Sequence, residues 1–176
     1  MIIFKPEGPI RLPVSKKGHA KRITANDLDK LEKERAYRKI SKRNGCYIFC
    51  IQHRKGILPV YVGKTEKSFE KESFQSHKIE KYNDYLFSNT NIVGRPVMFF
   101  LLAPIKSGPP NKKKINDLEN ALIKYCHRMN PKLSNEYKLP DKEWSIKGFQ
   151  GGGQGKTSGP SKLLKKMLGL ESGDLQ

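Results

Sequence analysis

One stretch decides the fold of this 176-residue chain: residues 45–65, which read GCYIFCIQHRKGILPVYVGKT. Residues 46–51 and 58–62 are rich in β-branched and aromatic side chains, which favour strands. The segment between them is polar and ends on Gly56, as hairpin loops commonly do. The stretch therefore predicts a β-hairpin whose second strand runs into Gly63-Lys64-Thr65, where backbone N–H groups and a cationic side chain can converge on a ligand.

Hydrophobic spacing predicts the elements around this hairpin. Residues 26–41 show a sparse apolar stripe preceded by a capping box variant, Thr24 with Asp27, which indicates a helix packed by one edge. The apolar residues of 68–87 fit no single period, so we expect a helix interrupted by a turn. Residues 97–102 are apolar throughout and lie between two prolines, which is typical of a buried strand.

The most regular helical pattern spans residues 115–129, just before Pro131. Its apolar residues recur at steps of three and four positions and form one stripe: Ile115, Leu118, Leu122, Cys126 and Met129. A hairpin, a helix, a strand and a second helix in this order predict a small α+β domain. We expect a three-stranded antiparallel sheet flanked by helices.

The two ends of the chain differ in composition from its middle. Residues 1–23 contain three prolines with several glycines and lysines, and are interpreted as an extended arm. From residue 148 the chain is rich in Gly, Lys and Ser and ends in a short basic amphipathic piece, 161–170. The expected division is a basic N-terminal arm and helix (1–44), a central domain (45–140), and a flexible C-terminal tail with a short basic helix (141–176).

The charge of the chain indicates the class of its partner. Lys and Arg number 35 against 17 Asp and Glu, so the formal net charge is +18. The basic residues occur in every segment, which is typical of proteins that bind a polyanion. Nucleic acid is the first candidate and an anionic membrane surface the second. We expect a cytoplasmic protein without a membrane span or a signal peptide, because no apolar run has the required length.

The three cysteines, Cys46, Cys50 and Cys126, are interpreted as reduced core residues. An odd number of cysteines in a chain without a secretory signal favours free thiols in the cytoplasm. Cys46 and Cys50 lie four positions apart on one strand and so share a face. A zinc site that also uses Cys126 and His127 is disfavoured, because the spacing matches no common zinc pattern.

Glu119 is a carboxylate placed within an apolar stripe. On a helix that turns about 100° per residue, it lies about 40° from Ile115 and about 20° from Cys126. A carboxylate in such a position must be paired, hydrogen-bonded or bound to a metal. The alternative is that Glu119 lies at the edge of the stripe and reaches solvent or a lysine.

Taken together, these motifs resemble those of the GIY-YIG nuclease family. Residues 45–48 (GCYI) and 61–63 (YVG) are similar to the family's two-part signature. Residues 118–123 (LENALI), followed by 130–135 (NPKLSN), are similar to its closing motif. The motifs occur in the family's order over roughly residues 45–135, so the chain is identified as a divergent member of the family.

The resemblance implies a phosphodiesterase that uses one divalent cation, Mg²⁺ or Mn²⁺. Glu119 would be the metal ligand, and Asn135 would help to complete the site. Tyr47 would act as general base or orient the attacking water, and Tyr61 would position that water or the scissile phosphate. The alternative is that both tyrosines are ordinary half-buried sheet residues, because tyrosine is favoured in strands. Lys64 could stabilise negative charge on the phosphoryl oxygens, as phosphodiester hydrolysis requires.

The chain departs from the family pattern after the second strand of the hairpin. The family places an arginine in the helix that follows, whereas this chain has no arginine between Thr65 and Arg95. Lys71 stands nearest the expected position and keeps the charge without the bidentate fork of a guanidinium. His77 resembles a histidine found there in some members; the alternative is a solvent-facing helix residue.

Three function hypotheses follow. The first is a divalent-metal-dependent endonuclease, a hydrolase that acts on nucleic acid, with DNA favoured over RNA. The second, motivated by the missing arginine, is a GIY-YIG-like nucleic-acid-binding module with weakened or lost chemistry. A structural RNA-binding protein is a third, supported by charge alone, because the sequence lacks the aromatic signature of single-strand RNA readers.

Overall fold

The computed structural model describes residues 2–17, 20–88, 94–105, 110–135, 144–146 and 158–170. Its strands are β1 (Ile2–Arg11), β2 (Ser15–Lys17), β3 (Ala20–Arg22), β4 (Gly45–His53), β5 (Gly56–Thr65), β6 (Arg95–Leu102) and β7 (Trp144–Ile146). Its helices are α1 (Ala25–Lys33), α2 (Arg35–Arg38), α3 (Phe69–Glu72), α4 (Ser76–Ser88), α5 (Lys112–Met129) and α6 (Gly159–Met167). Every described helix is too short or too polar to cross a bilayer.

The main sheet has the order β5-β4-β6-β1-β7. Four strands pair antiparallel, and the short β7 adds to β1 in parallel. The hairpin β2–β3 forms a separate two-stranded sheet. The prediction of an α+β domain with helices against an antiparallel sheet is confirmed, and the count of three strands is wrong.

The antiparallel strand missing from the prediction is β1, because residues 1–23 were expected to form an extended arm. Residues 2–11 are extended but pair with β6 inside the sheet, and the pairing is irregular between Glu7 and Ile10. Gly8 and Pro9 lie within this irregularity. Proline is tolerated at such a bulge, although it reads in the sequence as a loop residue.

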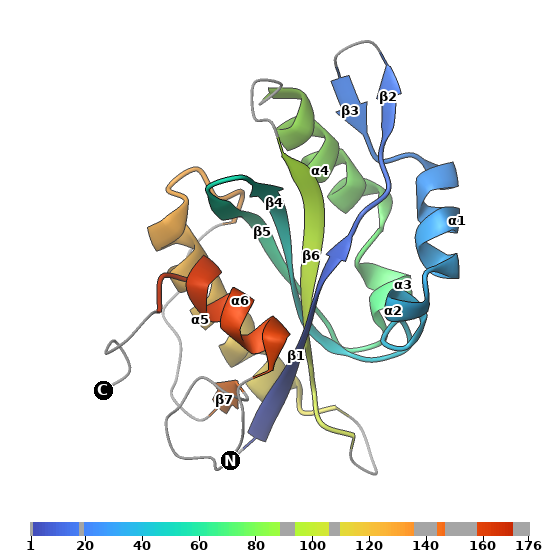
Figure 1. Cartoon of the computed structure of the whole chain (residues 1–176). Coiled ribbons are helices and arrows are strands. Elements are labelled where there is room, and N and C mark those ends of the chain that lie inside the picture. The colour runs from blue at the N-terminus through green and yellow to red at the C-terminus, as the bar shows by residue number, and fades with distance from the viewer. Residues whose placement is uncertain are drawn as a thin grey trace.

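The sheet is buried on both faces (Figure 1). We call them the α1–α4 face and the α5–α6 face, after the helices that cover them. On β4, Tyr47, Phe49 and Ile51 pack on the α1–α4 face, and the alternate residues Cys46, Ile48 and Cys50 pack on the α5–α6 face. Strands covered on both sides need apolar residues at every position, which explains the unbroken apolar runs of β4 and β6.

The predicted hairpin is confirmed and is longer than predicted. Its two strands leave only Arg54 and Lys55 as the turn. Phe49 pairs with Tyr61, but the next residue, Cys50, pairs with Pro59, so one residue of β5 bulges at this point. The bulge lies next to Tyr61, and such irregularities bend a strand and aim side chains near functional sites.

The helices follow the predicted pattern with two changes. The capping box of Thr24 and Asp27 begins α1, but the helix ends at Lys33, and α2 is a separate short turn. The expected interruption within 68–87 is the break between α3 and α4. The three cysteines are fully buried free thiols, as predicted for core residues.

The basic amphipathic piece predicted in the tail forms α6, and it is part of the core. Its residues Leu164, Met167, Leu168 and Leu170 pack on the α5–α6 face of the sheet together with Phe4. Within the expected C-terminal tail, residues 158–170 therefore contribute side chains to the core. The rest of the expected tail lies outside the described residues, apart from β7.

Candidate active site

Tyr47 and Gly63 lie opposite each other across the hairpin, as paired residues of β4 and β5. The Tyr47 side chain lies over Gly63, and a Cβ atom at position 63 would come within 2.7 Å of Tyr47 Cε2. Real Cβ atoms do not approach so closely. A residue without a side chain is therefore required opposite Tyr47, which gives the glycine of the second motif a packing role.

An aromatic cluster encloses the Tyr47 ring on the α1–α4 face. Tyr61 lies with its ring centroid 6.5 Å from that of Tyr47, and Phe69 lies edge-on at 6.3 Å. Tyr82 of α4 stacks on Phe49 at 4.1 Å and contacts Tyr61 at 5.8 Å. Tyr47 and Tyr61 thus belong to one aromatic cluster, in which Tyr47 is fully buried and Tyr61 half-buried.

The Tyr47 hydroxyl is a buried polar group without a normal partner. It makes no hydrogen bond of normal geometry in the described part of the chain, although the Tyr82 hydroxyl lies beside it. Burial raises the pKa of Tyr47 far above its usual value, and Tyr61 and Glu119 raise it further. Tyr47 is therefore a neutral phenol at physiological pH, suited to orient a water or a phosphate oxygen rather than to take a proton.

Two lysines of α4 hold their ammonium groups over the tyrosine rings. Lys78 Nζ lies 5.6 Å from the ring centroid of Tyr47, and Lys81 Nζ lies 5.5 Å from that of Tyr61. Both distances are in the range of cation–π attraction. Lys78 is only 9% exposed and donates a hydrogen bond of 2.6 Å to the carbonyl of Glu72. Burial lowers the pKa of Lys78, and the charges of Glu72 and Glu119 oppose that shift.

An ion pair joins β5 to α5. Lys64 Nζ lies 3.0 Å from Glu119 Oε2, and it also donates to the side-chain oxygen of Asn116, one turn earlier on α5. The Glu119 side chain is 18% exposed. Glu119 is therefore paired with a lysine at the edge of the apolar stripe, which is the alternative that its helical position left open.

The charge of Glu119 connects the helix to both tyrosines. Burial and then the Glu119 carboxylate raise the pKa of Tyr61, and the same carboxylate acts on Tyr47 and Lys78. Such effects weaken with distance. We call the carboxylate, the two tyrosines and the two cations Lys64 and Lys78 the electrostatic cluster, because the charge of Glu119 acts on each of the other four.

Asn135 is hydrogen-bonded to the backbone of the edge strand β5. Its side-chain oxygen accepts a hydrogen bond of 2.7 Å from the Val62 N–H, and its amide nitrogen donates one of 2.8 Å to the Val62 carbonyl. Ser134 N–H donates to the carbonyl of Val60, 3.0 Å away. The segment around Asn135 thus satisfies backbone groups of an edge strand, and it fixes the residue between Tyr61 and Gly63.

We expect Asn135→Ala to weaken this strand. The variant loses both hydrogen bonds to Val62, and a destabilisation of about 1–2 kcal/mol follows. Urea unfolding measures the loss, and amide hydrogen exchange at Val62 should become faster than in the parent. Asn26→Ala, at an exposed position of α1, is the control and should change neither. Unchanged exchange at Val62 would contradict this role for Asn135.

Interactions in the structure connect five of the seven predicted site residues, and the other two are not connected to them. Tyr47, Tyr61, Lys64 and Glu119 form the cluster, and Asn135 supports it through the backbone. Lys71 and His77 are exposed, and within the described residues no hydrogen bond, ion pair or ring contact links them to the other five. Their roles stay predictions.

Sequence reasoning missed several residues of the cluster, above all Lys78 and Tyr82 of α4. These residues lie four positions apart, with Lys81 between them, so that all three can share one face of a helix. That spacing is the signal that could have identified them. No comparable sequence pattern identifies Asn116, because its side chain takes part only by accepting a hydrogen bond from Lys64 on β5.

The residues present fit a magnesium ion bound through one carboxylate. Mg²⁺ sites in proteins commonly use one or two carboxylates, with waters and substrate phosphates as the remaining ligands. Glu119 supplies one such group, and its side chain is partly exposed, so a cation with its waters could reach it. The described residues contain no group of three or more His, Cys, Asp or Glu side chains placed to coordinate a metal alone.

Comparison of the chain with family models, with curated proteins and with solved structures gave no match.

Proposed function

We propose that the chain is a divalent-metal-dependent endonuclease of the GIY-YIG type, which hydrolyses phosphodiester bonds of nucleic acid. The observation that carries the proposal is the ion pair of Glu119 on α5 with Lys64 of the hairpin that carries both motif tyrosines; the charge of Glu119 also raises the pKa of each tyrosine. The tyrosines and the carboxylate belong to motifs far apart in the sequence, and their convergence is what a shared site requires.

Each residue of the cluster has a separate role in the proposed hydrolysis. Tyr47, held neutral by burial, orients the attacking water or a phosphate oxygen through its hydroxyl. Tyr61, half-buried at the edge of the cluster, positions the scissile phosphate. Lys64 and Lys78 supply positive charge where the phosphoryl oxygens become more negative. Glu119 would hold the metal, which supplies further charge stabilisation and assists the leaving oxygen when bound.

The pairing of Glu119 with Lys64 is a resting arrangement in this proposal. When the carboxylate serves the cation, the Lys64 ammonium is free to bind a phosphate oxygen instead. Partly exposed ion pairs are weak in water, so the exchange costs about 1 kcal/mol or less. Lys64 and Glu119 thus bind each other when substrate and metal are absent, and in this proposal they separate to bind the phosphate and the metal.

The partner in this proposal is nucleic acid, with DNA favoured over RNA. A net charge of +18 provides the general attraction to a phosphate backbone. Free cysteine thiols, all buried, suit the reducing cytoplasm, where we propose that the protein acts.

A second candidate function is a nucleic-acid-binding module that has lost hydrolysis. Two observations favour it: the buried, neutral Tyr47, and an exposed Lys71 near the place where the family has arginine. This module would bind DNA with an affinity that falls steeply with salt, because each lysine–phosphate contact releases counterions. It would not cleave DNA with any divalent cation.

Nicking of supercoiled plasmid distinguishes the two functions. The endonuclease converts supercoiled DNA to open circles with Mg²⁺ or Mn²⁺ and not with EDTA, whereas the binding module only retards the plasmid in a gel. Salt-sensitive retardation without nicking under any metal would overturn the proposed enzyme. Absence of both would exclude the two functions together.

Lys78 provides a sharper prediction within this assay. Lys78→Met keeps the length of the side chain and removes its charge beside Tyr47, so we expect nicking to slow by about 10²–10³-fold. Lys71→Met, which removes an equal charge from an exposed position, should slow it by less than about tenfold. Lys71→Arg tests the arginine position of the family directly: faster nicking by this variant, with Lys78→Met unchanged, would assign the missing charge to position 71.

A further inference from the structure

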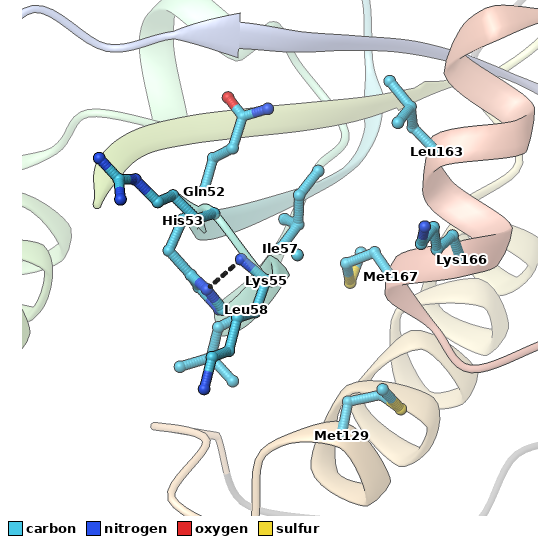
Figure 2. Close-up of a pocket in the computed structure, with 11 residues that line it drawn as sticks. Gln52, His53, Lys55, Ile57, Leu58, Met129, Leu163, Lys166 and Met167 are labelled. Atoms are coloured by element: carbon cyan, nitrogen blue, oxygen red, sulfur yellow. Dashed lines mark hydrogen bonds between the residues drawn. The ribbon is translucent and has the colours of Figure 1, made fainter. Parts of the chain in front are cut away.

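A groove of about 400 Å³ lies between the β4–β5 turn and α6 (Figure 2). One wall is the hairpin turn and the strand residues beside it, and the other is α6; Met129, the last residue of α5, lies between them. The turn is held in shape by a hydrogen bond of 3.2 Å from the Lys55 N–H to His53 Nδ1. The groove belongs to a different part of the hairpin from Tyr47, which lies six residues before His53 on the other face of the sheet.

The floor of the groove is apolar and partly exposed to water. Its apolar residues are Ile57, Leu58, Met129, Leu163 and Met167. Met129 is 41% exposed and Leu163 39% exposed, and they are two of the five large hydrophobic residues that the described chain leaves exposed. Met129 also ends the apolar stripe of α5, whose earlier members are buried. Two exposed side chains gathered at one concave place indicate a ligand site more than scattered surface residues do.

The rim of the groove is cationic. Arg54, Lys55 and Lys166 line it, with His53, and no acidic residue does. The ion pairs found among the described residues involve other lysines. The three cations are therefore available to an anionic ligand whose apolar groups reach the floor.

We propose that this groove docks an acidic segment of a partner protein that inserts large apolar side chains. The methionines of the floor adapt to varied apolar shapes, as in other peptide-binding grooves. Carboxylates that flank the anchors would pair with the rim cations. This docking site does not depend on the nuclease proposal and serves to bring the protein to a partner.

Other occupants agree less well with the lining. Single-stranded nucleic acid is held by aromatic side chains that stack on bases, and none lines this groove. A membrane surface favours apolar residues that protrude, whereas these are recessed. A second copy of the chain would bring another +18 charge to a cationic rim.

Nuclear magnetic resonance on the full ¹⁵N-labelled chain tests the proposal. The probe is a pool of peptides of about twelve residues, or three helical turns, with Asp or Glu at half of the positions and Leu, Met, Ile or Phe at spacings of three and four. The matched pool carries Lys in place of the acids. We expect saturable shifts at residues 53–58, 129 and 163–167 with the acidic pool alone.

Matched variants locate the binding. Leu163→Glu should weaken binding of the acidic pool at least about tenfold, and Ile105→Glu, at an exposed position elsewhere, should not. Lys55→Glu should weaken it severalfold, with the exposed Lys33→Glu as its control; both lysines are on the surface, so the fold is retained. Lack of saturable shifts, or equal binding of both pools, would overturn the proposal. So would stronger shifts of the same amides by an oligo-thymidine strand or by phosphatidylserine vesicles.

Discussion

Replacement of Glu119 by alanine should abolish metal-dependent nicking while the protein stays folded. In the proposed enzyme Glu119 holds the metal, and loss of a metal ligand removes several kcal/mol of charge stabilisation. The rate should fall on the order of 10³-fold or more. The fold should change little, because the side chain is paired at the surface edge of α5 and such pairs contribute about 1 kcal/mol or less.

Two further variants separate the causes. Glu119→Gln keeps the shape and loses the charge, so it should be as inactive as the alanine variant if metal binding is the role of this residue. Glu7→Ala removes a carboxylate that is also paired with a lysine, at 2.6 Å on β1, and should nick at the parental rate. Parental nicking by Glu119→Gln would show that Glu119 serves only to hold Lys64, and the assignment as metal ligand would be wrong.

Replacement of Gly45 by alanine should cause the largest loss of stability of any single change considered in this chain. Gly45 has φ +139° at the start of β4, where it pairs with both neighbouring strands. An added Cβ would collide with the carbonyl oxygen of Leu101 and lie 3.0 Å from the nitrogen of Ala103. Both are backbone atoms at the end of β6 and just after it, so they cannot move aside as the tip of a flexible side chain could.

We expect a loss of about 2–5 kcal/mol, which adds about 1–2 kcal/mol for the unfavourable φ to about 1–3 kcal/mol for overpacking. Urea unfolding measures it. Gly56→Ala is the matched control: Gly56 has φ +150° at the start of β5, but no atom lies within 4 Å of the added Cβ. The Gly56→Ala variant should therefore lose only the part of the stability that comes from the unfavourable φ, about 1–2 kcal/mol. An equal loss in both variants would contradict the close approach of β4 and β6 at Gly45.

Sequence patterns predicted correctly the elements that are determined by residues close together in the sequence. The hairpin, the break within 68–87, the capping box and the long helix α5 all follow from neighbouring residues, and each is present. The strand β1 was missed because Gly8 and Pro9 interrupt its pattern. Its partner β6 lies about ninety residues away in the sequence, so pairing across the sheet compensates for what the local sequence lacks.

The candidate site shows the same division. Tyr47 and Tyr61 sit on adjacent strands of one hairpin, so their proximity could be predicted from the turn alone. Lys78 could not be found in this way, because its place beside Tyr47 depends on how α4 packs across the sheet. The contact of Asn135 with Val62 spans 73 residues, and its role as a support of β5 is visible only in three dimensions.

The two faces of the sheet close at different times during synthesis. Every buried residue on the α1–α4 face lies between Ile10 and Leu102, so this face can form once β6 has left the ribosome. The opposite face needs α5 and then Leu164 and Met167 of α6, which pack against residues as early as Phe4. Until then a nascent chain presents an uncovered apolar sheet surface, which chaperones bind and which promotes aggregation. A newly made chain should therefore complete the tyrosine cluster on the α1–α4 face before α6 covers the opposite face of the sheet.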